Sequence, residues 1–255
     1  MVFAESTAEA VMVRVPRALP ALVLVIAACT ANTPTGGPGE LPQGSDPVTL
    51  DPADFVDVVD HPFWPMSPGS VWVYHETDAD GNELQVEVTV TDEIRDILGI
   101  TATVVHDVVS MDGEVIEDTL DWYAQDSAGN LWYLGEDTTE YENGEPVSTA
   151  GSWEAGVDGA QPGIILPADP QVGMAYRQEY YAGEAEDEAQ ILSLDESVDV
   201  PFGIFDGCLQ TEDSTPLDPD VVEHKYYAEG VGPVLVVQVS GGESREELIS
   251  FTHGD

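Results

Sequence analysis

The sequence predicts an all-β fold, an antiparallel meander of roughly ten to twelve strands that rolls into a barrel or half-barrel. Three observations predict it: apolar and polar residues alternate along many short segments, turn residues separate these segments, and no long segment has a helical period. Because the connections are short, strands that follow each other in the chain should pair antiparallel. A β-sandwich is the alternative, since a sheet of this length either closes on itself or folds over.

The clearest hairpin in the sequence spans residues 71–91. Residues 84–90 alternate between apolar and polar side chains, which predicts one buried and one solvated face. Residues 78–82 (Asp-Ala-Asp-Gly-Asn) form the turn, where Gly81 supplies a left-handed backbone conformation. The same residues superficially resemble a calcium loop, but Thr89 occupies the twelfth position, where such a loop carries an acid.

The same pattern repeats along the rest of the chain. Residues 92–98 could hold one helical turn. The segment 156–173 is rich in Gly and Pro and is predicted to be a long loop with an exposed apolar run. Such a loop is either a lid or partner contact, or a packed cover over one end of the barrel. Further strands are predicted over residues 101–110, 114–125, 131–135, 174–181, 188–198, 207–211, 222–228, 234–240 and 247–252.

The first residues of the chain have the pattern of a leader. Residues 1–28 are predicted to be a signal peptide, with Arg14 and Arg17 before an apolar stretch that is too short to span a membrane. The cleavage region, Ile-Ala-Ala-Cys at residues 26–29, resembles the lipobox of bacterial lipoproteins. This resemblance implies cleavage before Cys29, a lipid on its sulfur, and a protein anchored to the cell membrane that faces outside the cytoplasm.

The rest of the chain divides into two parts. Residues 29–47 are rich in Pro and Gly and form the predicted flexible tether. Residues 48–255 form a single acidic β domain. The leader leaves the true start of translation open between Met1 and Met12, because acidic residues are unusual at the beginning of a signal peptide.

The charge balance is extreme: 50 Asp and Glu residues stand against 6 Lys and Arg residues, a formal net charge of -44. Such a field repels phosphates, so nucleic acid is excluded as a partner. Two interpretations of the acids stay open. They either form a solvated surface suited to high salt, or they provide a cation-binding face, which makes cations the candidate partners.

Motifs that carry catalysis are missing from the sequence. It contains no nucleophile elbow, no zinc-binding helix motif, no phosphate-binding loop and no Cys-x-x-Cys pair, so no cofactor and no metal site are predicted. His61, His75, His106 and His224 lack the spacing typical of metal ligands. Cys208 has no disulfide partner if the other cysteine is lipidated, and is expected to be a small buried apolar residue.

Aromatic residues supply the candidate ligand surface. In two adjacent pairs on predicted strands, Trp-Tyr at 122–123 and at 132–133, the two rings point to opposite faces of the sheet. These rings either belong to the core and to ordinary cross-strand pairs, or they line a binding pocket or groove. The candidate residues are Trp122, Tyr123, Trp132, Tyr133, Tyr226 and Tyr227.

Three segments together resemble a family of secreted bacterial all-β domains. Residues 61–74 (HPFWPMSPGSVWVY) are similar to the phrase FPxxPGxxWxY that opens such domains, and residues 226–234 (YYAEGVGPV) to the phrase YAxGVGxV that leads their closing hairpin. Residues 121–133 resemble the middle hairpin, whereas Pro233 stands where an aliphatic residue is common. The resemblance covers residues 61–234 and implies architecture and export, but no activity.

Two functions agree with these observations. The first is a lipid-anchored extracytoplasmic binding or envelope-associated module, whose ligand the sequence does not identify. The alternative is an extracytoplasmic hydrolase, with metal assistance, which needs at least two of the four histidines to converge with acids in one cleft. The sequence leaves open whether the protein is an enzyme.

Overall fold

The structure is a computed structural model that describes residues 41–254. The predicted signal peptide, Cys29 and the tether up to residue 40 lie outside the described residues. The described part is almost entirely β, with one short 3-10 helix, Pro52–Asp54. In this part no helix is long and apolar enough to cross a membrane. The strands in chain order are β1 (Phe55–Val56), β2 (Asp60–His61), β3 (Trp64–Pro65), β4 (Val71–Thr77), β5 (Glu83–Ile97), β6 (Ile100–Met111), β7 (Glu114–Asp126), β8 (Leu131–Glu142), β9 (Glu145–Ser148), β10 (Trp153–Glu154), β11 (Gln161–Leu166), β12 (Ala175–Arg177), β13 (Glu179–Tyr180), β14 (Glu188–Val200), β15 (Gly203–Ser214), β16 (Val222–Ala228), β17 (Gly232–Ser240) and β18 (Arg245–Thr252).

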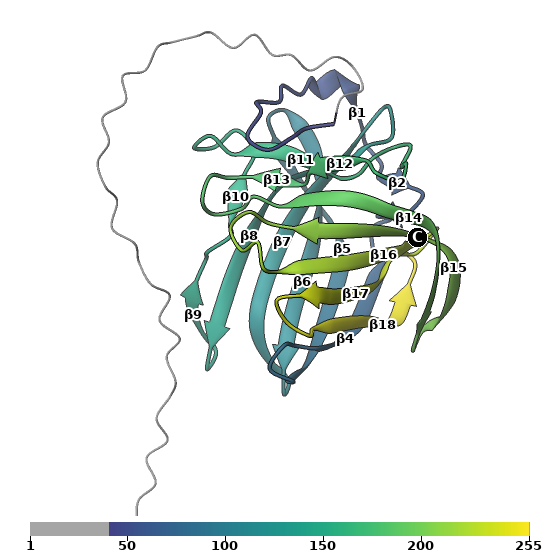
Figure 1. The fold of residues 1–255 in the computed structure, drawn as a ribbon. Coiled ribbons are helices and arrows are strands. Elements are labelled where there is room, and N and C mark those ends of the chain that lie inside the picture. The colour runs from purple at the N-terminus through teal and green to yellow at the C-terminus, as the bar shows by residue number, and fades with distance from the viewer. Residues whose placement is uncertain (1–40, 255) are drawn as a thin grey trace, which may run out of the picture. The chain divides into compact units, whose positions relative to one another are not determined.

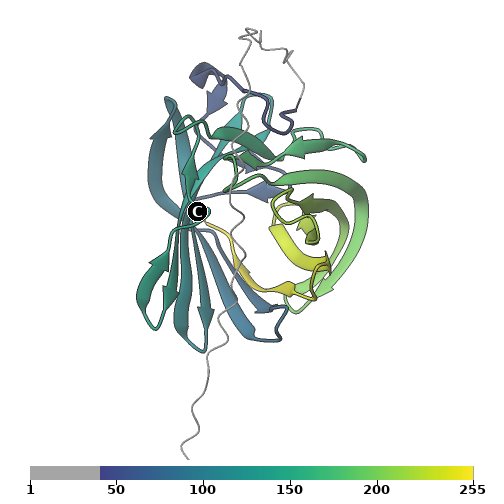
Figure 2. The same ribbon diagram turned by 60° about the vertical axis from the view of Figure 1, so that its left-hand side comes forward.

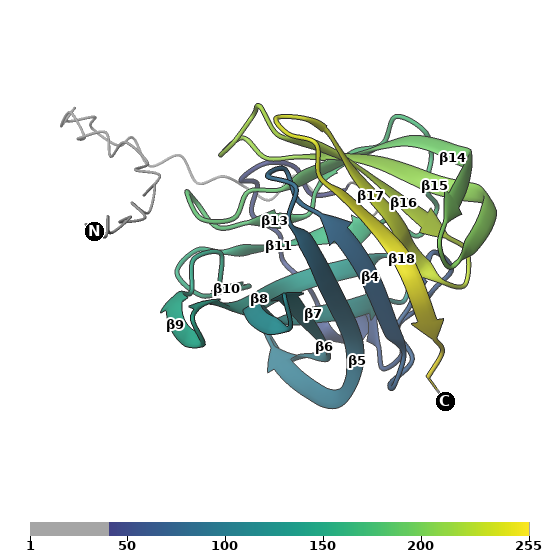
Figure 3. The ribbon, with the colours of Figure 1, turned by 90° about the horizontal axis from the view of Figure 1, so that it is seen from below.

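The strands form one 16-stranded antiparallel sheet, and β2 and β3 form a separate hairpin. Along β4 to β8 and again along β14 to β18, each strand pairs with the next one in the chain, which confirms the predicted meander. The last strand, β18, then pairs with β4, so that Leu248 lies opposite Tyr74. Figure 2 shows the two resulting walls, β4–β8 in blue to teal and β14–β18 in green to yellow. Figure 3 shows β18 alongside β4.

One short segment closes the sheet into a barrel. β12 and β13 stand at the two ends of the strand order, although they follow each other in the chain. β12 pairs with β14, and after Gln178 the chain continues into β13, which pairs with β11. The Tyr176 hydroxyl also donates to the Ile165 carbonyl, 3.1 Å away. The sheet is therefore a nearly closed barrel and not a sandwich (Figure 1).

Arg177 holds this closing segment in place. Its side chain is only 1% exposed, and its guanidinium donates to the carbonyls of Gly44, Asp46 and Pro162 at 2.7, 2.8 and 2.7 Å. Burial lowers the pKa of Arg177 to about 10, so the group still carries its charge at neutral pH. The last residues of the predicted tether are therefore bound to the barrel wall.

Two expectations about local structure are wrong. Residues 92–97 form no helical turn, because they continue β5 up to a tight turn at Leu98 and Gly99, where φ is 56° and 82°. The apolar run within 156–173 is no exposed loop either, because it forms β11, in which the three residues of the run are buried. An apolar run without alternation is typical of a strand that is buried on both faces. On one face Ile165 points into the barrel, and on the other Ile164 packs in a second apolar cluster.

Candidate functional site

The barrel contains a half-open cavity of about 370 Å³. Cavities of this size hold small molecules, and the mouths of β-barrels are a common place for them. Both walls of the barrel, the hairpin β2–β3 and the closing segment all contribute side chains. The lining residues are Trp64, Tyr74, Val86, Val88, Val105, Asp107, Asp121, Tyr123, Tyr133, Glu136, Ile165, Gln178, Glu179, Asp187, Lys225, Tyr227, Pro233, Val236 and Glu246.

Four rings in this lining touch one another and form what we call the aromatic wall: Trp64, Tyr123, Tyr133 and Tyr227. Tyr123 and Tyr133 are opposite each other on β7 and β8, and their stacked ring centroids are 4.9 Å apart. Trp64 from β3 lies 5.4 Å from the Tyr123 ring and 6.2 Å from the Tyr227 ring. Gly232 permits this position of Trp64, because a Cβ atom there would lie 2.8 Å from the indole ring.

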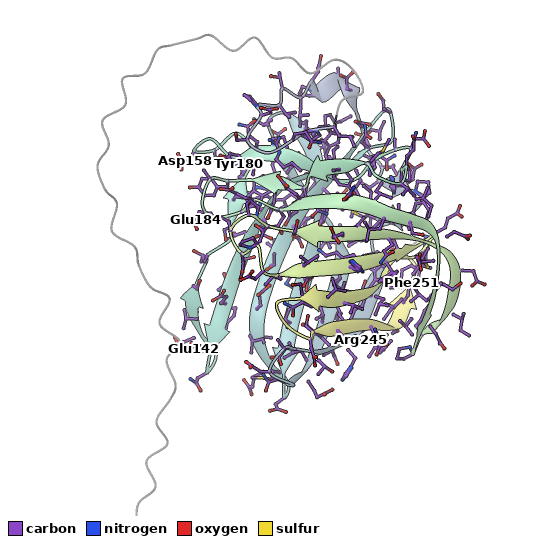
Figure 4. The ribbon with its side chains drawn as sticks, in the orientation of Figure 1. Glu142, Asp158, Tyr180, Glu184, Arg245 and Phe251 are labelled. Carbon is purple, nitrogen blue, oxygen red and sulfur yellow. The ribbon has the colours of Figure 1, made fainter. Side chains whose placement is uncertain are left out.

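Six carboxyl side chains and one amine share the cavity with these rings. On β6 the alternation of strand side chains explains the inward position, because Asp107 follows Val105 on the inner face. Figure 4 labels Tyr180 and Arg245, which adjoin two of these acids in the sequence: Glu179 on β13 and Glu246 on β18. The acids are Asp107, Asp121, Glu136, Glu179, Asp187 and Glu246, and the amine is Lys225.

Within residues 41–254, Asp107 and Glu246 are the cavity acids whose charge no hydrogen bond offsets. Burial, and after it repulsion from Glu246, raises the pKa of Asp107 to about 8. Burial and repulsion from Glu76 raise the pKa of Glu246 to about 8, although Lys225 acts in the opposite direction. Asp107 Oδ1 is buried and has no hydrogen-bond partner among the described residues. Both groups therefore tend to hold a proton at neutral pH.

Asp121 and Glu136 share one hydroxyl group. Tyr133 Oη lies 2.5 Å from Asp121 Oδ1 and 2.8 Å from Glu136 Oε2. Burial raises the pKa of each carboxyl group to about 7, and the hydrogen bond from Tyr133 offsets part of this rise. Because a hydroxyl group donates one proton, it can stabilise one carboxylate at a time, which favours a protonated state of the other. The two carboxyl groups therefore titrate as a coupled pair near neutral pH.

Lys225 forms an ion pair with an acid that does not line the cavity. Its Nζ lies 3.2 Å from Asp213 Oδ2, and the same carboxyl group accepts hydrogen bonds from Thr211 at 2.5 Å and Gln178 at 3.1 Å. Burial alone would lower the pKa of Lys225, but Asp213 and neighbouring acids hold it well above its usual value. Lys225 is therefore charged and mainly balances Asp213, which leaves the six cavity acids short of positive charge.

The structure splits the predicted ligand surface in two. Tyr123, Tyr133 and Tyr227 line the cavity, because they occupy inward positions of β7, β8 and β16. Their three neighbours in sequence point the other way, as alternation requires. The sequence pattern therefore identified part of the lining but could not tell which ring of each pair belonged to it.

The other three candidate residues make contacts outside the cavity. Arg95 lies over the Trp122 ring, with its guanidinium carbon 3.8 Å from the ring centroid. Trp132 Nε1 donates to Asp126 at 2.9 Å. The Tyr226 hydroxyl accepts a hydrogen bond of 2.9 Å from a glutamine side chain. These three aromatic residues support the sheet from its outer face.

Sequence reasoning missed the cavity acids and Trp64. A usable signal existed, because an acid at an inward position of an alternating strand stands out against its apolar neighbours. Asp107 lies between Val105 and Val109 on the inner face of β6. Because the chain has 50 acidic residues, the few that line the cavity could not be distinguished from the others in the sequence.

The four histidines lie apart in the described structure. His61 Nε2 is 3.2 Å from the Pro167 carbonyl oxygen, and none of the four histidines is among the lining residues of the cavity. His75, His106 and His224 each pair with an acid of their own, at 2.5, 3.1 and 3.5 Å. Within residues 41–254 no group of His, Cys, Asp or Glu side chains has the arrangement of a metal site. The convergence that the hydrolase alternative requires is thus not found in this part of the chain.

Comparison with known proteins adds two structural similarities. No family model matches the chain, and no curated protein matches it. A Bacteroides fragilis protein with a YmcC-like fold, assigned as exported, shares 16% identity over 75% of this chain and 99% of its own, with a TM-score of 0.45. A Parabacteroides distasonis protein assigned as a lipoprotein shares 16% identity over 74% of this chain and 98% of its own, with a TM-score of 0.43.

Proposed function

We propose that this chain is a lipid-anchored extracytoplasmic binding protein and that the cavity of the barrel is its ligand-binding site. The observation that carries the proposal is the cavity itself, about 370 Å³ with an aromatic wall and six carboxyl groups. A packed barrel interior would contain interlocking apolar side chains, since buried polar groups without partners destabilise a fold. Here acids line an internal space, which is typical of a site that a ligand completes.

The proposed location rests on the leader. The apolar stretch, the lipobox-like residues 26–29 and the tether support export and a lipid on Cys29. The test is expression of the full chain and of Cys29→Ser in a bacterium that processes lipoproteins, followed by separation of membrane and soluble fractions. We expect the wild type in the membrane fraction and the variant in the soluble fraction. Equal partition of the two chains would refute lipidation.

The binding site is tested by titration and by filling the cavity. Three probes of one shape, 3-methylindole, tryptamine and indole-3-acetate, are titrated by calorimetry into the full-length Cys29→Ser chain. We expect at least one of them to bind with a Kd below about 1 mM. Val236→Phe, which adds bulk to the cavity lining, should weaken this binding at least tenfold.

A matched control lies on the same strand. Val239 is 48% exposed and does not line the cavity, so Val239→Phe should leave the affinity within about twofold of wild type. Circular dichroism and the melting temperature of both variants verify that the barrel is intact. The proposal fails if none of the three probes binds, or if Val236→Phe binds as well as Val239→Phe.

A further inference from the structure

The charge balance of the cavity disfavours two classes of ligand. Six carboxyl groups line the space, and the one amine, Lys225, is bound to Asp213. An anionic ligand would add repulsion to groups that already repel one another. A neutral ligand would gain no electrostatic attraction from these carboxyl groups, whether they are protonated or charged. A ligand with a positive charge would offset the charge of these carboxyl groups.

Two of the acids are free to receive that charge. Asp121 and Glu136 are occupied by the Tyr133 hydroxyl, and Glu179 accepts a hydrogen bond of 2.7 Å from Trp153 Nε1. A hydrogen bond from Thr215 offsets part of the rise that burial causes in the pKa of Asp187. Asp107 and Glu246, by contrast, have no such partner within the described residues, and the Oδ1 atom of Asp107 is fully buried. Both residues line the same cavity, and an ammonium group supplies the N–H donors and the positive charge that their carboxylates lack.

The aromatic wall distinguishes an organic cation from a bare metal ion. A metal ion prefers a shell of several oxygen ligands, and residues 41–254 contain no cluster of acids and histidines arranged for one. Rings of tyrosine and tryptophan instead favour an apolar body and attract a neighbouring ammonium group by the cation–π effect. Carboxylates beside contiguous rings therefore match an amine that carries an apolar group.

We infer that the ligand of this cavity is a small organic cation, a protonated amine on an apolar body, whose ammonium group lies between Asp107 and Glu246 and whose body lies against Trp64, Tyr123 and Tyr227. This inference rests on the proposed function, because it names the chemical class that the binding site takes. It also explains the unpartnered Asp107 carboxylate, which the ammonium group would neutralise.

Binding of such an amine is linked to protons. Several acids act on Asp107, namely Glu246 on β18, Glu117 on β7, Glu136 on β8 and Glu76 on β4, and Lys225 and Glu223 on β16 act on Glu246. Because Asp107 and Glu246, whose pKa values are raised to about 8, hold protons at pH 6, the amine must displace them, whereas at pH 8.5 it meets charged carboxylates. The affinity should therefore rise at least tenfold between these two pH values.

The test compares the three indole probes by charge and removes one carboxylate. At pH 8 tryptamine should bind at least tenfold more tightly than 3-methylindole, and indole-3-acetate should bind most weakly. Asp107→Asn should lower the affinity for tryptamine at least tenfold and leave that for 3-methylindole nearly unchanged. The control is Asp112→Asn, the same change at an exposed hairpin tip, which should leave all three affinities within about twofold.

The outcomes separate this inference from the proposed function. If 3-methylindole or indole-3-acetate binds as tightly as tryptamine, the cavity binds ligands but does not select cations, and the inference is wrong. The same holds if Asp107→Asn and Asp112→Asn bind tryptamine equally well. If no probe binds, the proposed function fails, and the inference fails with it.

Discussion

At the scale of single residues, Asp107 is a buried side chain whose charged form destabilises the folded protein. On β6 it lies opposite Val88 of β5 and Thr119 of β7, and its Oδ1 atom has no partner within the described residues. Burying a carboxylate without hydrogen bonds destabilises a protein. A destabilising group that lines a cavity is more easily understood as part of a binding site than as part of a core.

We therefore expect Asp107→Asn to stabilise the ligand-free protein. At pH 8 the free energy of unfolding should rise by roughly 1 kcal/mol, because the amide carries no charge to bury. At pH 5 the gain should be smaller, because the pKa of Asp107 is raised to about 8 and the native carboxyl group is already protonated. Urea denaturation at both pH values measures the difference.

Asp112→Asn serves as the control for this change. Asp112 is exposed and has a φ of 52°, a conformation that Asn also adopts readily. Its effect should be small and independent of pH. A loss of stability in Asp107→Asn that is larger at pH 8 than at pH 5 would show that the carboxylate is held by a favourable contact.

At the scale of elements, two hairpin turns have the same five-residue construction. Asp78 and Asp126 each begin a turn of sequence Asp-x-x-Gly-Asn, and each accepts hydrogen bonds of 2.7–2.9 Å from the backbone amides two and four residues later. The glycines, Gly81 and Gly129, have φ values of 81° and 100°. The Asp78 carboxylate thus has a structural role in the turn, as does Asp126 in the second one.

The closing segment depends on a glycine that permits close packing of two backbones, whereas the turn glycines supply a left-handed conformation. A Cβ atom at Gly163 on β11 would lie 2.2 Å from the Gln178 carbonyl oxygen, so β11 and the closing segment could not approach as they do. We expect Gly163→Ala to destabilise the protein by about 1–3 kcal/mol. Thermal denaturation followed by circular dichroism measures the loss.

Gly203 provides the comparison, because the nearest atom to a Cβ there is 3.9 Å away. Gly203→Ala should change the stability by less than about 0.5 kcal/mol. Equal effects of the two substitutions would mean that the contact between β11 and β13 contributes nothing to closure of the barrel.

At the scale of the whole molecule, the acids form two populations that respond differently to salt and pH. Acids on the outer surface face water, where salt screens their repulsion over a distance of about 3 Å at 1 M. The cavity acids are enclosed by the barrel, and burial is the largest cause of their raised pKa values. A raised pKa in the folded state means that the native protein binds these protons more tightly than the unfolded chain does.

The ligand-free protein should therefore become less stable as the pH rises. The native state holds more protons than the unfolded state from about pH 4, the usual range of carboxyl groups, up to the raised pKa values of about 7 to 8. The free energy of unfolding falls throughout this interval. We expect the melting temperature in 1 M KCl to decrease from pH 5.5 to pH 8.5.

The double variant Asp107→Asn/Glu246→Gln distinguishes the cavity from the surface in this experiment. It removes the two groups whose pKa values are raised to about 8, so its melting temperature should depend less on pH than that of the wild type. A wild-type melting temperature that rises with pH would contradict the assignment of these carboxyl groups to an enclosed space.

The candidate site could be predicted from the sequence only in part. Alternation places Tyr123 and Tyr133 on one face of their strands, and both do line the cavity. Trp64 could not be identified in this way, because it lies in a short hairpin that packs on distant strands. Asp107 and Glu246 come from β6 and β18, which lie more than a hundred residues apart in the chain. Their mutual repulsion exists only after the barrel has formed.

The sequence by itself determined most of the strands, the turns between them and the meander, because alternation of side chains and the conformation of turn residues depend on near neighbours. Tertiary structure alone decided that the sheet closes, through residues 175–180, and that β18 pairs with β4. Such pairings join segments far apart in the chain, and no local pattern specifies which strand edges meet. The cavity and the charge it encloses are consequences of that closure, so they became visible only in the folded barrel.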